Sequence, residues 1–224
     1  MKLTSKVLFT ILMIAMIISL SNKKSLSQVT DKDGNVYKTV TIGNQEWMAE
    51  NLNVSHYGNG DPIPEVQDST KWPKLTTGAW CYYQNNSDNG KTYGKLYNWY
   101  AVKDTRGLTP NGWHIPSDEE WAKLINFLGG DSVAGGKMKA TTLWNSPNEG
   151  ATNESGFTAY SGGYRSSFAV WGDSNNVGLC GCFWSSSKGS FDNALYRTLL
   201  FTDSIVFRDN FVKIQGLSVR CVRV

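Results

Sequence analysis

We predict no helix after Gly130, and this limits the fold more than any other feature of the sequence. Loops rich in Gly, Asn and Ser alternate there with short apolar stretches, which is typical of β-strands. The predicted strands are residues 156–160, 183–186, 194–201, 205–211 and 217–224. Aromatic residues make up 12% of the chain and charged residues only 18%, which excludes a disordered chain and a coiled coil.

The clearest helix signal begins at Ser117. Ser117 followed three residues later by Glu120 forms a capping box, and the acidic residues 118–120 suit the positive end of a helix dipole. The apolar face of this helix consists of Trp121, Leu124, Ile125 and Leu128. Gly129 and Gly130 then end the helix.

The first half of the chain predicts a hairpin and a second helix. Residues 36–42 alternate as a strand does, Gly43 and Asn44 form a turn, and residues 45–52 return. Residues 55–78 are rich in turn residues and read as a long loop, whereas residues 93–102 have helical spacing. Strands, two helices and a strand-rich half predict one α+β domain.

The N-terminus has the order of a secretory signal peptide. Lys2 and Lys6 precede an apolar run over residues 7–20, and a short polar stretch ends at small residues near Ser27. The run is too short to span a bilayer comfortably, so we predict cleavage after Ser27 rather than a retained anchor. We therefore expect a leader at 1–27, a single domain at 28–224, no membrane span after processing, and export to the cell surface or medium, with the periplasm as the alternative.

Removing this leader changes the charge of the chain. The formal charge of the whole sequence is +3, and four lysines lie within residues 1–27, so the remaining chain has a net charge of −1. No cluster of Lys and Arg remains, which argues against a nucleic-acid partner.

An exported chain can form disulfides. The chain has four cysteines, which are Cys81, Cys180, Cys182 and Cys221. Four cysteines allow three connectivities, and a bridge between Cys180 and Cys182, which would span a single residue, is disfavoured by the usual Cα separation. We favour Cys81–Cys221 as the long-range disulfide. Cys180 and Cys182 are then buried thiols, a soft-metal site or a redox pair.

Eight segments in order resemble the Fibrobacter succinogenes major paralogous domain family of secreted bacterial proteins. These segments are DGNVYKTV (33–40), WMAENL (47–52), YGKLYNWYAV (93–102), GWHIPSDEEW (112–121), WNSPNEGATNESGF (144–157), GGYR (162–165), FWSS (183–186) and SVRCV (218–222). The resemblance covers residues 29–224.

A more distant similarity, carried by residues 116–121 and 216–220, is to the formylglycine-generating enzyme superfamily. It implies a C-type-lectin-like fold: two helices packed on small twisted antiparallel sheets, with long loops on one face. Members of the Fibrobacter family often carry a Cys before the Gly-Trp-His motif, where this chain has Thr109. The usual bridge of the family is then absent or rearranged here.

Nine tryptophans divide into two groups. Trp47, Trp99, Trp113 and Trp121 lie in apolar motifs, and we predict them to be core. The other five fall in or beside loops, where partial burial and an exposed sugar-binding ring are both open. These candidate ligand-binding residues are Trp72, Trp80, Trp144, Trp171 and Trp184.

The loop at 144–156 is rich in side-chain oxygens. A Ca²⁺ ion prefers carboxylate and carbonyl oxygens, so a calcium site is one interpretation, and side chains capping the loop backbone are the other. The candidate metal ligands are Asn145, Asn148, Glu149, Asn153 and Glu154.

No motif of a known catalytic chemistry appears. The sequence has only two histidines, His56 and His114, and we interpret His114 as structural, donating to a backbone carbonyl. Cys180 and Cys182 are too close in sequence for formylglycine-generating chemistry. We expect a secreted non-catalytic recognition module that binds polysaccharide or a surface protein. The alternatives are an extracellular enzyme and a structural component of an exported surface assembly.

Overall fold

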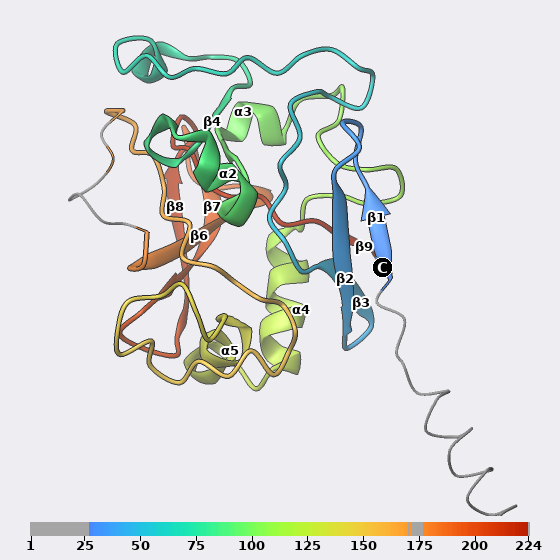
Figure 1. Cartoon of the computed structure of the whole chain (residues 1–224), viewed down its shortest axis with the longest axis vertical. Coiled ribbons are helices and arrows are strands. Elements are labelled where there is room, and N and C mark those ends of the chain that lie inside the picture. The colour runs from blue at the N-terminus through green and yellow to red at the C-terminus, as the bar shows by residue number, and fades with distance from the viewer. Residues whose placement is uncertain (1–26, 170, 172–176, 224) are drawn as a thin grey trace, which may run out of the picture.

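The computed structural model describes residues 27–169, 171 and 177–223. The predicted leader, apart from Ser27, lies outside this range. The described part is a mixed α+β structure with four helices and three antiparallel sheets (Figure 1). The helices are α2 (Ser87–Tyr93), α3 (Trp99–Val102), α4 (Asp118–Phe127) and α5 (Asp131–Met138), with short 3₁₀ turns η1 (Trp72–Lys74) and η2 (Tyr83–Asn85).

The first sheet contains the predicted hairpin. Its strand order is β1 (Gln28–Thr30), β2 (Val36–Ile42), β3 (Gln45–Met48) and β9 (Val222–Arg223), so the last strand pairs with the second strand of the hairpin. Gly43 has a φ of +63°, which a tight turn requires and glycine adopts without strain. Two residues therefore suffice to connect β2 and β3.

The strand-rich half forms a three-stranded antiparallel sheet. Its strands are β6 (Cys180–Lys188), β7 (Asn193–Leu200) and β8 (Val206–Val212), and each hydrogen-bonds to the next. A smaller pair, β4 (Trp80–Cys81) and β5 (Leu96–Tyr97), lies between the two larger sheets in the chain order. The prediction of strands at 183–186, 194–201 and 205–211 is confirmed.

Helix α4 forms as the sequence predicts. The Ser117 side chain accepts from the Glu120 N–H, and the Glu120 carboxylate accepts from the Ser117 N–H at 2.8 Å, so the capping box is complete. Trp121, Leu124 and Ile125 are buried and pack α4 into the core. The left-handed backbone of Gly129 and Gly130 follows the helix end.

Three local predictions are wrong. Residues 93–102 form strand β5 and the four-residue helix α3 instead of one helix, because Gly94 interrupts the run at a φ of +70°. Residues 156–160 and 217–221 make isolated bridges instead of strands. Helix α5 was not predicted at all.

Helix α5 contains two adjacent glycines, which local propensity disfavours by about 1 kcal/mol each. Both are required by packing. A Cβ on Gly135 would lie 2.6 Å from the carbonyl oxygen of Ser204, and one on Gly136 would lie 2.4 Å from that of Gly150. Tertiary contact therefore outweighs propensity here.

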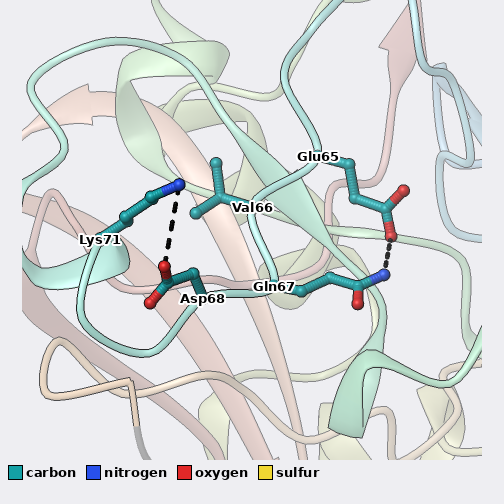
Figure 2. Close-up of a pocket in the computed structure, with 5 residues that line it drawn as sticks. All are labelled: Glu65, Val66, Gln67, Asp68 and Lys71. Carbon is teal, nitrogen blue, oxygen red and sulfur yellow. Dashed lines mark hydrogen bonds and ion pairs between the residues drawn. The ribbon is translucent and has the colours of Figure 1, made fainter.

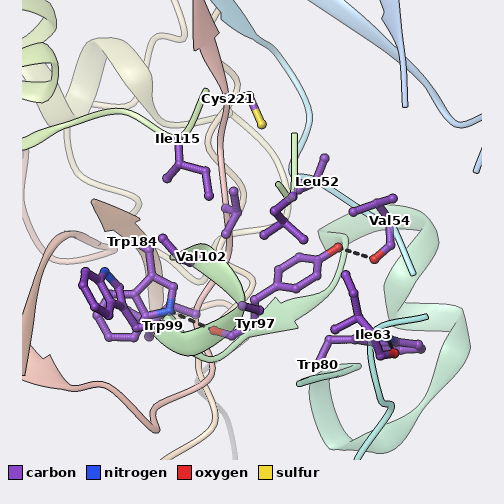
Figure 3. Packing of buried hydrophobic residues seen from close by; sticks show 14 of the residues in the cluster. Leu52, Val54, Ile63, Trp80, Tyr97, Trp99, Val102, Ile115, Trp184 and Cys221 are labelled. Atoms are coloured by element: carbon purple, nitrogen blue, oxygen red, sulfur yellow. Dashed lines mark hydrogen bonds between the residues drawn. The ribbon is translucent and has the colours of Figure 1, made fainter. Parts of the chain in front are cut away.

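The core is aromatic and lies between the sheets and helices. The four motif tryptophans Trp47, Trp99, Trp113 and Trp121 are all buried, as predicted. In the main cluster, the Trp184 indole N–H donates to the carbonyl oxygen of Tyr97, and the Tyr97 hydroxyl donates to that of Val54 (Figure 3). The polar atoms of Trp184 and Tyr97 are thus satisfied by backbone inside the core.

We find no helix within residues 27–169, 171 and 177–223 with both the length and the apolar character needed to cross a bilayer.

Candidate functional site

The five loop tryptophans do not form an exposed row. Trp72 and Trp184 have no exposed surface and Trp80 is 6% exposed, whereas Trp144 and Trp171 are half-buried. Three of the five therefore belong to the core and cannot present a ring face to a sugar in this structure.

Three of these tryptophans nevertheless gather around one surface segment, residues 65–71. The Val66 N–H donates to the carbonyl oxygen of Trp80 at 2.9 Å. The Trp72 N–H donates to the carbonyl oxygen of Asp68 at 3.1 Å, where the segment enters η1. Trp171 approaches the segment through Arg165, which touches both.

Arg165 is fully buried and holds the segment from beneath. Its guanidinium donates to the carbonyl oxygens of Val66 and Gln67 at 2.5 and 2.9 Å. The guanidinium carbon lies 4.4 Å from the ring centre of Trp72 and 5.1 Å from that of Trp171. A planar cation that contacts two aromatic rings and donates to two carbonyls is a stiff support, because these contacts together restrict its rotation.

The segment carries a surface pocket of about 370 Å³ (Figure 2). Glu65, Val66, Gln67, Asp68 and Lys71 line it. The Gln67 amide donates to the Glu65 carboxylate at 2.8 Å, and the Lys71 ammonium lies 3.8 Å from the Asp68 carboxylate. The pocket is thus lined by two carboxylates, an amide and an ammonium group.

Asp68 remains an acceptor at neutral pH. The hydroxyl and N–H of Thr70 both donate to it and hold the pKa of its carboxyl below the ordinary value. An ionised carboxylate beside an amide can take hydrogen bonds from neighbouring hydroxyl groups of a ligand.

A comparison with models of protein families shows the family of this chain. The model of the Fibrobacter succinogenes major domain matches residues 40–223, which is most of the chain. The chain belongs to this family. The searches among curated proteins and among solved structures found no match.

In this Fibrobacter succinogenes major domain, the other two candidate tryptophans lie away from the pocket. Trp184 sits in the main core cluster (Figure 3). The Trp144 indole N–H donates to the carbonyl oxygen of Ala159, and the ring packs on the second cluster beside helix α4. The sequence did not distinguish these two from the three around residues 65–71.

The candidate calcium loop is held together by its own side chains. Asn148 donates to the carbonyl oxygen of Ala140, Asn153 both donates to and accepts from Thr158, and Glu154 pairs with Lys137. The exposed Asn145 and Glu149 complete the predicted set. The bonds of Asn148 and Asn153 to backbone atoms fit the other interpretation of this sequence, in which side chains cap the loop backbone.

A buried ammonium occupies the centre of this region. Lys139 donates to the carbonyl oxygens of Glu149, Leu200 and Asp203 at 2.7–2.9 Å. Burial lowers the pKa of Lys139, and the nearby Asp203 and Glu149 oppose the shift. Within the described residues, no three His, Cys, Asp or Glu side chains are grouped to hold a metal ion.

Each histidine forms a close pair with a carboxylate, which the sequence did not reveal. His114 Nε2 lies 2.6 Å from Glu120, and His56 Nδ1 lies 2.6 Å from Asp33. The prediction that His114 donates to a backbone carbonyl is therefore wrong. Burial raises the pKa of Glu120, but bonds from Ser117 and His114 outweigh it and leave that pKa below its ordinary value.

No disulfide joins the four cysteines, all of which are described and buried. Cys81 and Cys221 lie in different core clusters, so the predicted bridge between them is not formed. Burial raises the pKa of Cys81 to about 12, which keeps it a thiol at neutral pH. The neighbouring sulfurs of Cys180 and Cys182 are 3.8 Å apart on one face of β6.

Proposed function

We propose that this domain is an exported, non-catalytic recognition module whose pocket at residues 65–71 binds polysaccharide. The observation that carries the proposal is the rigid support of that pocket. Ligand-binding groups on Glu65, Gln67 and Asp68 extend from a backbone that Arg165 fixes from below. Preorganised polar groups lose little entropy when a ligand binds.

The chemistry of the pocket suits a polyhydroxylated ligand. Sugar hydroxyls both donate and accept, so they pair with carboxylates, amides and ammonium groups alike. Glu65, Gln67, Asp68 and Lys71 supply all three. The half-buried Trp171 contacts Arg165 and so supports the guanidinium that holds the segment. Calcium is kept as a variable of the test, because the loop at 144–156 offers oxygen atoms.

The proposal also includes a C-type-lectin-like fold and export of the protein from the cell. Small antiparallel sheets packed with helices and long connecting loops support a C-type-lectin-like arrangement similar to that of formylglycine-generating enzymes. The lysines and apolar run of residues 1–27 support export.

An array of immobilised neutral and acidic polysaccharides, probed with the purified protein with and without calcium, tests the function. We expect binding to at least one polysaccharide and a loss of about tenfold or more in affinity for Asp68→Ala. The matched control is Asp88→Ala, because Asp88 and Lys91 form a similar exposed pair three residues apart outside the pocket. Absence of binding in both conditions, or an equal loss in both variants, contradicts the proposal.

One observation favours an enzyme as the second candidate. His114 lines a pocket of about 280 Å³ that also includes Asp104 and Ser186. Glu120 accepts from Nε2, so Nδ1 is left as the basic nitrogen of the imidazole. Hydrolysis of chromogenic esters or glycosides that is lost in His114→Gln would support this alternative, and no hydrolysis by the unmodified protein would contradict it.

A further inference from the structure

A second pocket lies at the opposite end of the molecule from residues 65–71. It has a volume of about 520 Å³ and is formed where the turn of the β2–β3 hairpin meets the end of α4. Figure 1 shows this turn and α5 at the lower end, whereas the segment that precedes β4 crosses the upper end. The residues that line this second pocket include Ile42, Phe127, Leu128, Lys137 and Glu154.

An exposed aromatic ring forms one wall of this pocket. Phe127 is the last residue of α4 and is 65% exposed. A Cβ built on Gly43 would lie 3.1 Å from its Cδ2 and 3.2 Å from its Cγ, so the ring rests directly against the hairpin turn. The turn thus holds the ring in place while most of its surface stays open to solvent.

Charged groups stand beside this ring. Lys137 Nζ lies 3.1 Å from a carboxylate oxygen of Glu154, and both side chains are more than one-third exposed. The Ser155 hydroxyl donates to the carbonyl oxygen of Lys137 at 2.8 Å, which joins the loop to α5. The pocket therefore combines a fixed aromatic ring with a carboxylate and an ammonium.

We propose that this pocket is a second carbohydrate-binding site. The apolar C–H face of a sugar ring stacks on Phe127, and its hydroxyls bond to Glu154 and Lys137. The apolar floor of Ile42 and Leu128 continues the surface on which the ring lies. This site shares its ligand class with the proposed function but uses none of the same residues.

Two sites at opposite ends make the domain bivalent. A short oligosaccharide fills one site at a time, so two molecules bind to one protein. A long polysaccharide chain, or two neighbouring chains, can engage both sites and bind more tightly through effective concentration. The domain can then bridge polysaccharide strands.

Calorimetry with a short oligosaccharide chosen from the array measures the number of sites. We expect two per chain for the unmodified protein, one for Phe127→Ala and two for Phe127→Tyr, which keeps the ring. Phe191→Ala is the matched control, because Phe191 is a 98% exposed phenylalanine that lies on the β6–β7 hairpin. It should also leave two sites.

The two proposals fail in different ways. One site per chain in the unmodified protein, lost in Asp68→Ala but retained in Phe127→Ala, overturns the second site and leaves the proposed function in place. One site lost only in Phe127→Ala moves the recognition function to the second pocket. Unchanged binding in Phe127→Ala, or equal losses in Phe127→Ala and Phe191→Ala, overturns the inference as well.

Discussion

Arg165 and Arg220 are two fully buried arginines in different surroundings. Each stacks on an aromatic ring: Arg165 at 4.4 Å from Trp72 and Arg220 at 4.3 Å from Phe157. Neither forms an ion pair within the described residues, and both donate mainly to backbone carbonyls. Two regions of the molecule thus contain a buried arginine that stacks on a ring and donates to backbone carbonyls.

The regions differ in what the arginine holds. Arg220 donates to Met48, Phe157, Thr158 and Asn51, all at or near the core, and burial lowers its pKa to about 9. Arg165 donates to a surface segment, and its Nε has no hydrogen-bond partner among the described residues. All three guanidinium nitrogens of Arg220 donate hydrogen bonds within the core. Arg165 instead uses its two terminal nitrogens to hold the surface segment at residues 65–71.

Arg220→Met should have the largest effect of the changes considered. It leaves three buried carbonyls without a donor, each costing about 1–3 kcal/mol, so we expect the free energy of unfolding to fall by about 4 kcal/mol. Urea denaturation measures it. A loss below about 1 kcal/mol would show that the carbonyls find other donors and that this network is not essential.

Arg165→Met should cost less stability but should also impair the pocket. Only two carbonyls lose Arg165 as a donor, and one of them, that of Gln67, still accepts from the Asn85 amide at 3.1 Å. We therefore expect the free energy of unfolding to fall by about 3 kcal/mol or less. Polysaccharide binding should weaken well before the protein unfolds. Unchanged binding by the folded variant would contradict the view that Arg165 fixes the pocket.

Arg197 is a third buried arginine and sharpens the comparison, because its partner is a carboxylate. Asp118 lies 2.8 Å from Arg197 and 2.9 Å from Arg208. Burial raises the pKa of Asp118, but bonds from Arg208 and Arg197 outweigh it, so its folded pKa is below the ordinary 3.8. The stability that this carboxylate contributes is present above pH 3.8 and is lost as the pH falls through the folded value.

Asp118→Asn should therefore lower the free energy of unfolding by about 2 kcal/mol at neutral pH, and this deficit should shrink toward about pH 2. The deficits of Arg220→Met and Arg165→Met should change less over the same range, because neither arginine forms an ion pair with a carboxylate among the described residues, although the charge of Glu50 acts on Arg220. Denaturation of the three variants at both pH values checks this. A deficit of Asp118→Asn that persists in acid would contradict it.

The comparison also explains what the sequence could and could not predict. The β2–β3 hairpin and α4 were predicted because their signals are local: alternation around Gly43, and Ser117 with Glu120 three residues on. Helix α5 was missed because its glycines are explained only by distant backbone at Ser204 and Gly150.

The candidate site was missed for the same reason. The bond from Arg165 to Val66 joins residues 99 positions apart, and no local pattern marks either end. The position of Trp72 beside a loop does not reveal that its ring is buried against Arg165. A cation on a ring is a tertiary contact, so a single sequence does not show it.

Gln67→Ala should have the smallest effect on stability. The change keeps the backbone carbonyl that Arg165 holds and removes only an exposed amide, so the free energy of unfolding should change by less than about 0.5 kcal/mol. Binding should nevertheless weaken by about tenfold, since the amide is a ligand-facing group of the pocket. Titration with the array-selected polysaccharide, alongside urea denaturation, separates the two effects. A fall in stability without a fall in affinity would mean that residues 65–71 serve the fold alone and that Arg165, like Arg220, is only a core residue.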